Sequence, residues 1–118
     1  MPYLKIETNV AANKIPNDIS EKLCGVVAKT LNKPKEICVA SVVADMNLSF
    51  GGVEQPAAQV FLKCISGLGV EENKNHANAI CELLEKELGI SKDKVYIFFQ
   101  MFPASDVGFN GSTYDGMF

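Results

Sequence analysis

The sequence predicts an α+β fold with two layers, in which a strand–helix–strand unit occurs twice in tandem. Short β-rich runs alternate with two segments whose apolar residues recur at helical spacing. Their order along the chain is strand, helix, strand, and then the same again. Sliding one half of the chain over the other places Leu23 on Ile80 and Cys24 on Cys81, as a repeat would. With 118 residues, the chain is long enough for one domain with a real core.

The first unit begins with residues 3–8, whose alternating pattern is typical of a strand. Asp18 followed by Glu21 predicts a helix N-cap with its capping-box partner. The apolar face of this helix then runs to Leu31, and Asn32 and Pro34 end the helix. Residues 37–44 are rich in β-branched residues and apolar on both faces, which predicts a buried strand.

The second unit repeats this order. Residues 60–65 form its first predicted strand, and Glu71 stands where the start of a helix favours acidic side chains. Gly89 ends the predicted helix. Residues 95–102 form the last long strand, and residues 107–109 of the glycine-rich tail are expected to add a short edge strand.

Two strand–helix–strand units predict a four-stranded sheet with both helices on one face, because each crossover joins parallel strands. Strands 37–44 and 95–102 are apolar on both faces, although the two helices cover only one. The uncovered face would expose more apolar surface than soluble monomers tolerate. We therefore expect an oligomer in which the open sheet faces are buried.

Composition excludes several classes of function. The net charge is −3 and no run of Lys or Arg occurs, which argues against a nucleic-acid partner. No apolar run reaches the ~18 residues of a membrane span, and no signal peptide is recognisable, so a cytosolic location is expected. The four cysteines form no CxxC pair and are expected to be reduced, mostly buried thiols. With one His, a zinc site is not expected, and no P-loop or GxGxxG motif points to a nucleotide cofactor.

Pro2 is the most unusual chemical group of the chain. A small second residue normally allows removal of the initiator Met1, and Pro2 would then carry a free secondary amine. Burial or a nearby cation lowers the pKa of an amine, which would make Pro2 a base near working pH. The alternative is a Met-Pro start without a role. If Met1 remains, the Pro2 nitrogen is an amide and cannot act as a base.

Three further side chains are candidates on their own chemistry. Lys33, at the exit of the first helix, either complements the helix dipole or holds an anionic substrate and lowers the pKa of Pro2. Tyr96 lies in a strand of core residues, and it either packs there or presents its hydroxyl group to a partner. His76 is expected on the solvent-facing side of the second helix.

Several short motifs follow one another along the chain in a specific order and spacing: Met1-Pro2, Thr8-Asn9, Asn32-Lys33-Pro34, Ser49-Phe50-Gly51-Gly52, Ile65-Ser66-Gly67, Lys94-Val95-Tyr96-Ile97 and the tail 107–113. By these motifs the chain resembles the macrophage migration inhibitory factor family, which includes D-dopachrome tautomerase, along essentially its whole length. We therefore interpret residues 1–118 as a single tautomerase-like domain.

The resemblance implies a homotrimer with active sites at subunit interfaces, and keto–enol tautomerase activity on phenylpyruvate-like or dopachrome-like compounds without a cofactor. By this resemblance Pro2 is the base, and the substrate-binding residues are Lys33, Ile65, Tyr96 and Val107. The family also implies a cytokine that is secreted without a signal peptide and acts on a cell-surface receptor.

The sequence departs from the family pattern at three places. Phe98 stands where an Asn is usual, so a hydrogen-bond donor is replaced by an apolar wall among the substrate-binding residues. Ile37 replaces a frequent tyrosine, and residues 56–60 lack the CxxC that some members carry, which argues against thiol–disulfide activity. These departures leave an alternative open, in which the chain is an extracellular signalling protein whose pocket no longer turns over substrate.

Overall fold

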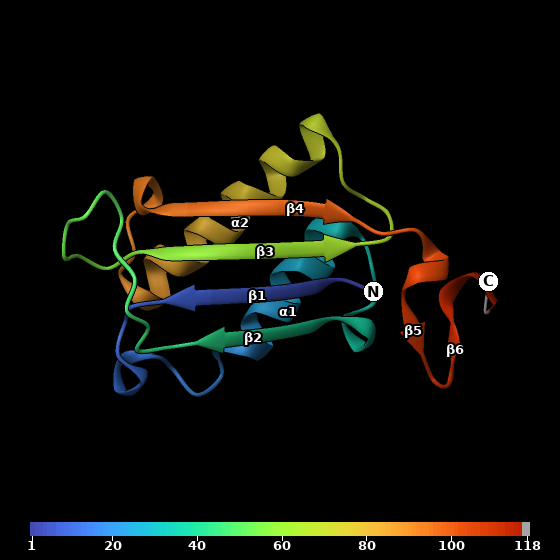
Figure 1. The fold of residues 1–118 in the computed structure, drawn as a ribbon, viewed down its shortest axis with the longest axis horizontal. Helices are drawn as coiled ribbons and strands as arrows, with labels where there is room; N and C mark the ends of the chain where they lie inside the picture. Colours follow the sequence, from blue (N-terminus) through green and yellow to red (C-terminus); the bar gives the residue numbers. More distant parts are fainter. Residues whose placement is uncertain (117–118) are drawn as a thin grey trace.

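A four-stranded sheet forms one layer of the structure, and two helices cover one of its faces (Figure 1). The structure is a computed structural model and describes residues 1–116. The strands are β1 (Tyr3–Thr8), β2 (Val39–Val43), β3 (Ala58–Cys64) and β4 (Val95–Met101), and the helices are α1 (Ile19–Leu31) and α2 (Val70–Leu88). Both predicted strand–helix–strand units are therefore confirmed.

The strands follow one another across the sheet in the order β2-β1-β3-β4. Within each unit the two strands are parallel, since β1 pairs with β2 and β3 pairs with β4. The two units join through β1 and β3, which are antiparallel, with Tyr3 opposite Lys63. The start of β1 and the end of β3 therefore lie side by side.

The core lies between the helices and one face of the sheet. Alternate residues of β1 and β3 point to the helices because successive side chains of a strand face opposite ways. Each of the largest contributors is 0% exposed, and α1 and α2 bury their apolar stripes against them: Leu4, Ile6, Val60, Leu62, Leu23, Val27, Ile80 and Leu84.

The open face of the sheet is apolar along both edge strands. Val39 of β2, and Tyr96 and Phe98 of β4, are 57%, 63% and 51% exposed. The central strands are more polar on this face, where Lys5 and Glu7 of β1 form an ion pair of 3.3 Å. The predicted apolar open face is thus confirmed for the two edge strands.

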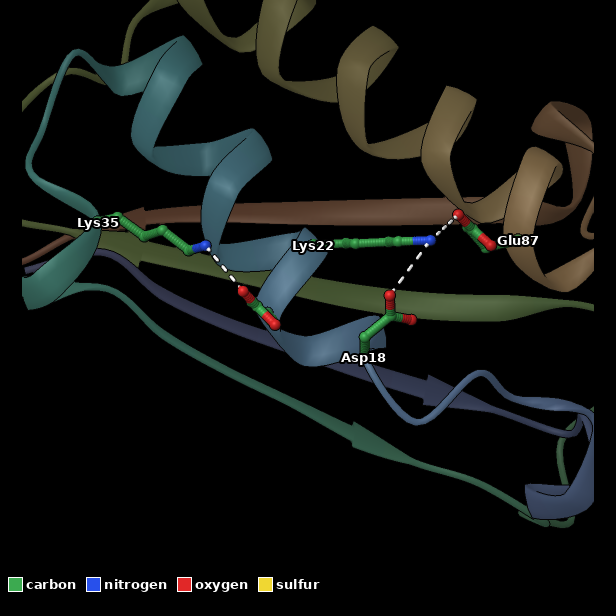
Figure 2. Close-up of polar contacts among 5 residues, drawn as sticks. Asp18, Lys22, Lys35 and Glu87 are labelled. Atoms are coloured by element: carbon green, nitrogen blue, oxygen red, sulfur yellow. Dashed lines mark hydrogen bonds and ion pairs between the residues drawn. The ribbon is translucent and has the colours of Figure 1, made fainter.

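Ion pairs on the helix layer correct the prediction of a capping box. Figure 2 shows Lys22 of α1 between Glu87 of α2, at 2.6 Å, and Asp18, at 3.5 Å. Asp18 does occupy the N-cap position, but its side chain makes no capping hydrogen bond. Its expected partner Glu21 instead pairs with Lys35 at 3.5 Å. Nearby lysines therefore attract both carboxylates away from the helix N-terminus.

The tail forms a small hairpin of its own. β5 (Gly108–Phe109) pairs with β6 (Ser112–Thr113) in an antiparallel sheet of two strands. Asn110 and Gly111 connect them with φ values of 53° and 78°, as the favoured two-residue hairpin turn requires. The prediction of an edge strand over residues 107–109 was wrong, because this segment pairs with the tail and not with the main sheet. The last two residues of the tail lie outside the described part.

Neither helix resembles a membrane span. Within residues 1–116, no helix combines the length and the apolar character that crossing a bilayer requires.

Candidate active site

The N-terminal residues are held at the end of β1 beside β2 and β3. The ring of Pro2 is fully buried, and its carbonyl group accepts a hydrogen bond of 2.9 Å from the backbone N–H of Val39. Because Tyr3 lies opposite Lys63, the antiparallel register places Met1 and Pro2 next to Cys64 and the segment that follows it. The N-terminus is therefore held at one end of the sheet, between β2 and β3.

Lys33 reaches this place from the end of α1. Asn32 adopts the left-handed conformation with a φ of 54°, which ends the helix and turns the chain. The side-chain amine of Lys33 then donates a hydrogen bond of 2.6 Å to the hydroxyl group of Ser66, just beyond β3. Ile65, the neighbour of Ser66, is half-buried. The side chain of Lys33 thus extends from the end of α1 to the residues that follow β3.

The surroundings shift the protonation equilibrium of the N-terminal amine. Burial is the largest cause and lowers the pKa of the Met1 α-amine below its ordinary value of 8.0. Cys64 opposes the shift, while the positive charge of Lys33 lowers the pKa further. A neutral amine is therefore favoured at this position, beside a lysine.

A tight turn supports Ser66. Gly67 has a φ of +89°, and a Cβ atom at this position would lie 2.8 Å from Cδ2 of Leu31. The carbonyl oxygen of Gly67 lies 2.9 Å from Nε2 of His76. Because a carbonyl oxygen only accepts hydrogen bonds, Nε2 carries the proton. Nδ1 of His76 is buried without a partner among the described residues.

His76 is 1% exposed, so the prediction of a solvent-facing histidine was wrong. It lies on the buried stripe of α2 together with Ile80 and Leu84, each four residues from the next. This spacing was visible in the sequence, but the run of polar residues 71–75 before His76 concealed it.

Val107 also lies near the N-terminus. It lines a hollow of about 390 Å³ together with Met1, Tyr3 and Lys63. We name the set of Pro2, Lys33, Ile65 and Val107 the amine half. These predicted site residues come from the two ends of the chain and from its middle, and the fold gathers them around the start of β1.

Tyr96 and Phe98 lie elsewhere. The Tyr96 ring stacks on Phe50 with ring centroids 5.3 Å apart, and Phe98 lies 6.2 Å from Tyr96. Gln100 is level with Tyr3 across the sheet, so Tyr96 lies about 13 Å further along β4. We name Phe50, Tyr96 and Phe98 the aromatic half. A single chain does not bring it together with the amine half.

Packing of Tyr96 into the core, the alternative that the sequence left open, does not occur, because the side chain is exposed on the open face. The aromatic half lines a hollow of about 350 Å³ with residues of the Leu48–Gly51 segment. Sequence reasoning missed the roles of Phe50 here and of Ser66 in the amine half. Both stand inside motifs that were recognised as wholes, so the motifs were the available signal.

The thiols only partly match their prediction. All four cysteines are free, but only Cys64 is buried, and Cys24, Cys38 and Cys81 are half-buried. Burial raises the pKa of the Cys38 and Cys81 thiols. Residues 1–116 contain no cluster of three or more His, Cys, Asp or Glu residues that is able to hold a metal ion.

Comparisons with known proteins cover nearly the whole chain. The family model described as macrophage migration inhibitory factor (MIF) matches residues 1–115. A macrophage migration inhibitory factor homolog from Brugia malayi is 40% identical over 114 residues, covering 97% of this chain and 99% of that protein. Macrophage migration inhibitory factor from Xenopus laevis is 35% identical with the same coverage. The structure of the Trichinella spiralis macrophage migration inhibitory factor superimposes with a TM-score of 0.90 at 33% identity, over 94% of this chain and 98% of that one.

Proposed function

Because the chain belongs to the macrophage migration inhibitory factor family and has its tautomerase fold, we propose that it is a keto–enol tautomerase with Pro2 as its base. One observation carries this proposal: Pro2 is fully buried at the start of β1, and Lys33 extends to Ser66 at the neighbouring end of β3. Burial and the charge of Lys33 lower the pKa of the Met1 α-amine there, and removal of Met1 would place the Pro2 amine in these surroundings. A base must be neutral to accept a proton, and an anionic substrate needs a cation beside that base. The amine half supplies both.

The proposed reaction needs no cofactor. Removal of Met1 exposes the Pro2 nitrogen, which takes a proton from the carbon next to a ketone and becomes charged. The proton is then returned to the oxygen of the enolate, and the amine is neutral again. Lys33 holds the substrate carboxylate and stabilises the negative charge that develops on the enolate. Ile65 and Val107 exclude water from the reacting atoms.

The substrate class follows from the aromatic half. We propose an aromatic keto acid of the phenylpyruvate type or a dopachrome-like compound, whose ring packs against Tyr96 and Phe98. The apolar Phe98 offers no hydrogen bond to the part of the substrate ring that it contacts. Ile37 makes the neighbourhood of Lys33 more apolar in the same way.

The two halves meet only if a second copy of the chain completes the site. We propose a homotrimer in which the amine half of one subunit faces the aromatic half of the next. Two observations support assembly: the separation of about 13 Å along the sheet within one chain, and the exposed apolar side chains of β2 and β4.

A second candidate function is signalling without catalysis. Phe98 and Ile37 favour it, because both remove polar groups from the pocket that the family uses. In this case the protein is made in the cytoplasm, leaves the cell by a non-classical route and binds a cell-surface receptor. A Pro2→Gly variant that signals fully in a cell assay would support this function, and one that does not signal would link the signal to the pocket.

The decisive assay for catalysis is tautomerisation of phenylpyruvate by protein whose loss of Met1 is verified by intact mass. The matched variant is Pro2→Gly, which keeps an N-terminal amine but loses the secondary one. We expect a fall in kcat/KM of about 100-fold or more, since a positioned base contributes 10²–10⁴. Equal activity of the two proteins would exclude Pro2 as the base.

A further inference from the structure

Lys63 lies on the open face of the sheet, on the side of the N-terminus opposite to Lys33. Its side chain is half-buried, and its amine lies 5.4 Å from the ring centroid of Tyr3 and 5.9 Å from that of Phe102. Together with Met1 and Val107, it lines the hollow of about 390 Å³. The two rings thus hold the ammonium group beside this hollow.

Within the described part of the chain, no carboxylate neutralises the charge of Lys63. Among residues 1–116 no ion pair involves Lys63, although Asp106 lines the same hollow. Contact with aromatic rings is a weak interaction and leaves the N–H groups of an ammonium free to donate. A half-buried cation with free donors in a hollow is suited to bind an anion.

We propose that Lys63 binds a second anionic group of the substrate, so that the preferred substrates are keto acids with two negative charges. The proposal rests on the proposed tautomerase function. Lys33 holds the carboxylate next to the reacting carbon from the helix side, and Lys63 holds the other anion from the open face. The rings of Tyr3 and Phe102 pack against the apolar body between them.

The experiment compares phenylpyruvate, which has one carboxylate, with 4-carboxyphenylpyruvate, which has two. The ratio of their kcat/KM values is measured for the native protein, for Lys63→Gln and for Lys74→Gln. Lys74 is an exposed lysine of α2 that pairs with Glu71, so its variant controls for loss of a surface charge. We expect the ratio to fall about tenfold in Lys63→Gln and to stay within twofold of the native value in Lys74→Gln. Asp106→Asn should raise the ratio, because it removes a carboxylate that repels the second anion.

Two outcomes would overturn the proposal. An unchanged ratio in Lys63→Gln would mean that the lysine only packs its methylene groups on the two rings. An equal loss with both substrates would mean that Lys63 supports the structure and does not select the substrate.

If the native protein turns over neither substrate, the proposed function is contradicted. Binding of an anion by Lys63 is then tested without turnover. Calorimetric titration with benzoate and with terephthalate measures binding alone. Tighter binding of terephthalate that is lost in Lys63→Gln supports the second anion site. Equal binding of the two acids contradicts it.

Discussion

The amine half and the aromatic half are built from opposite kinds of chemistry. The amine half joins an N-terminal segment, a helix exit and a strand exit through hydrogen bonds, with Lys33 bonded to Ser66 at 2.6 Å. The aromatic half consists of Tyr96 and Phe98 on the edge strand β4 and of Phe50, which stacks on Tyr96 from the segment between β2 and β3. Both members on β4 are more than half exposed. The amine half is complete within one chain, whereas the aromatic half exposes apolar surface that no part of residues 1–116 covers. Under the proposed function, proton transfer would be organised within one chain, and binding of the substrate ring would be organised by assembly.

Lys33→Ala tests the amine half, with the largest expected effect of the three variants below. Loss of the cation should lower kcat/KM for phenylpyruvate about 100-fold, because a preorganised partner of the developing charge is removed. The methyl ester, which lacks the carboxylate charge, should lose less. The two rates are measured side by side, and equal losses for the acid and the ester would contradict the role of Lys33 in holding the carboxylate.

Lys33→Ala should also shift the pH profile of kcat/KM. The proposed base acts only when neutral, so kcat/KM should rise with pH through the pKa of the amine. Lys33 is one of the causes, after burial, that lower the pKa of the Met1 α-amine, and the Pro2 amine would lie beside the same charge once Met1 is removed. Its removal should therefore raise this pKa and move the acid limb of the profile to higher pH. A limb that stays in place would show that burial alone sets the pKa.

Gly67→Ala tests whether the turn after β3 holds the amine half together. A φ of +89° and a clash with Leu31 should cost about 2 kcal/mol of unfolding free energy. Gly25→Ala is the matched control, since no atom lies within 4 Å of its added Cβ in α1. It should stabilise the protein by about 0.5–1 kcal/mol. Urea denaturation measures both, and equal stabilities of the two variants would contradict this account of the turn.

Phe98→Asn changes the aromatic half alone and has the smallest expected effect. An amide at this position would donate a hydrogen bond to a polar ring substituent, which is worth about 1 kcal/mol. The ratio of kcat/KM for 4-hydroxyphenylpyruvate to that for phenylpyruvate should rise about fivefold. A ratio that does not change would place Phe98 outside the substrate site.

The sequence predicted the helices and the long strands because their apolar periodicity is a local property. It also predicted the apolar open face, since the edge strands are apolar at successive positions. The strand order could not be read in this way, because β1 and β3 pair across about fifty residues of chain. His76 was misplaced for a related reason. The five residues before it in the sequence are polar, but its neighbours in the fold are Gly67 and Phe99.

The candidate site shows the same limit. Pro2, Lys33, Ile65 and Val107 were singled out from the sequence, and the fold places them around one end of the sheet. The distance of Tyr96 from them could not be read from the motifs, because a motif records spacing along the chain and not across the sheet. Asp18 failed as a side-chain cap because Lys22, one turn away, binds its carboxylate.

The most direct test of the central claim is a subunit-mixing experiment. Pro2→Gly removes the base, and the double variant Tyr96→Ala/Phe98→Ala removes the aromatic half. Each is first verified to be inactive and to have the oligomeric state of the native protein by size-exclusion chromatography. The two are then unfolded, mixed in equal amounts and refolded together.

If each site takes its two halves from neighbouring subunits, random assembly gives both native halves to about a quarter of the sites. With a site shared between subunits, the mixture should therefore recover about a quarter of the native activity with phenylpyruvate. A mixture as inactive as its two components would contradict it, because the site would then lie within a single chain.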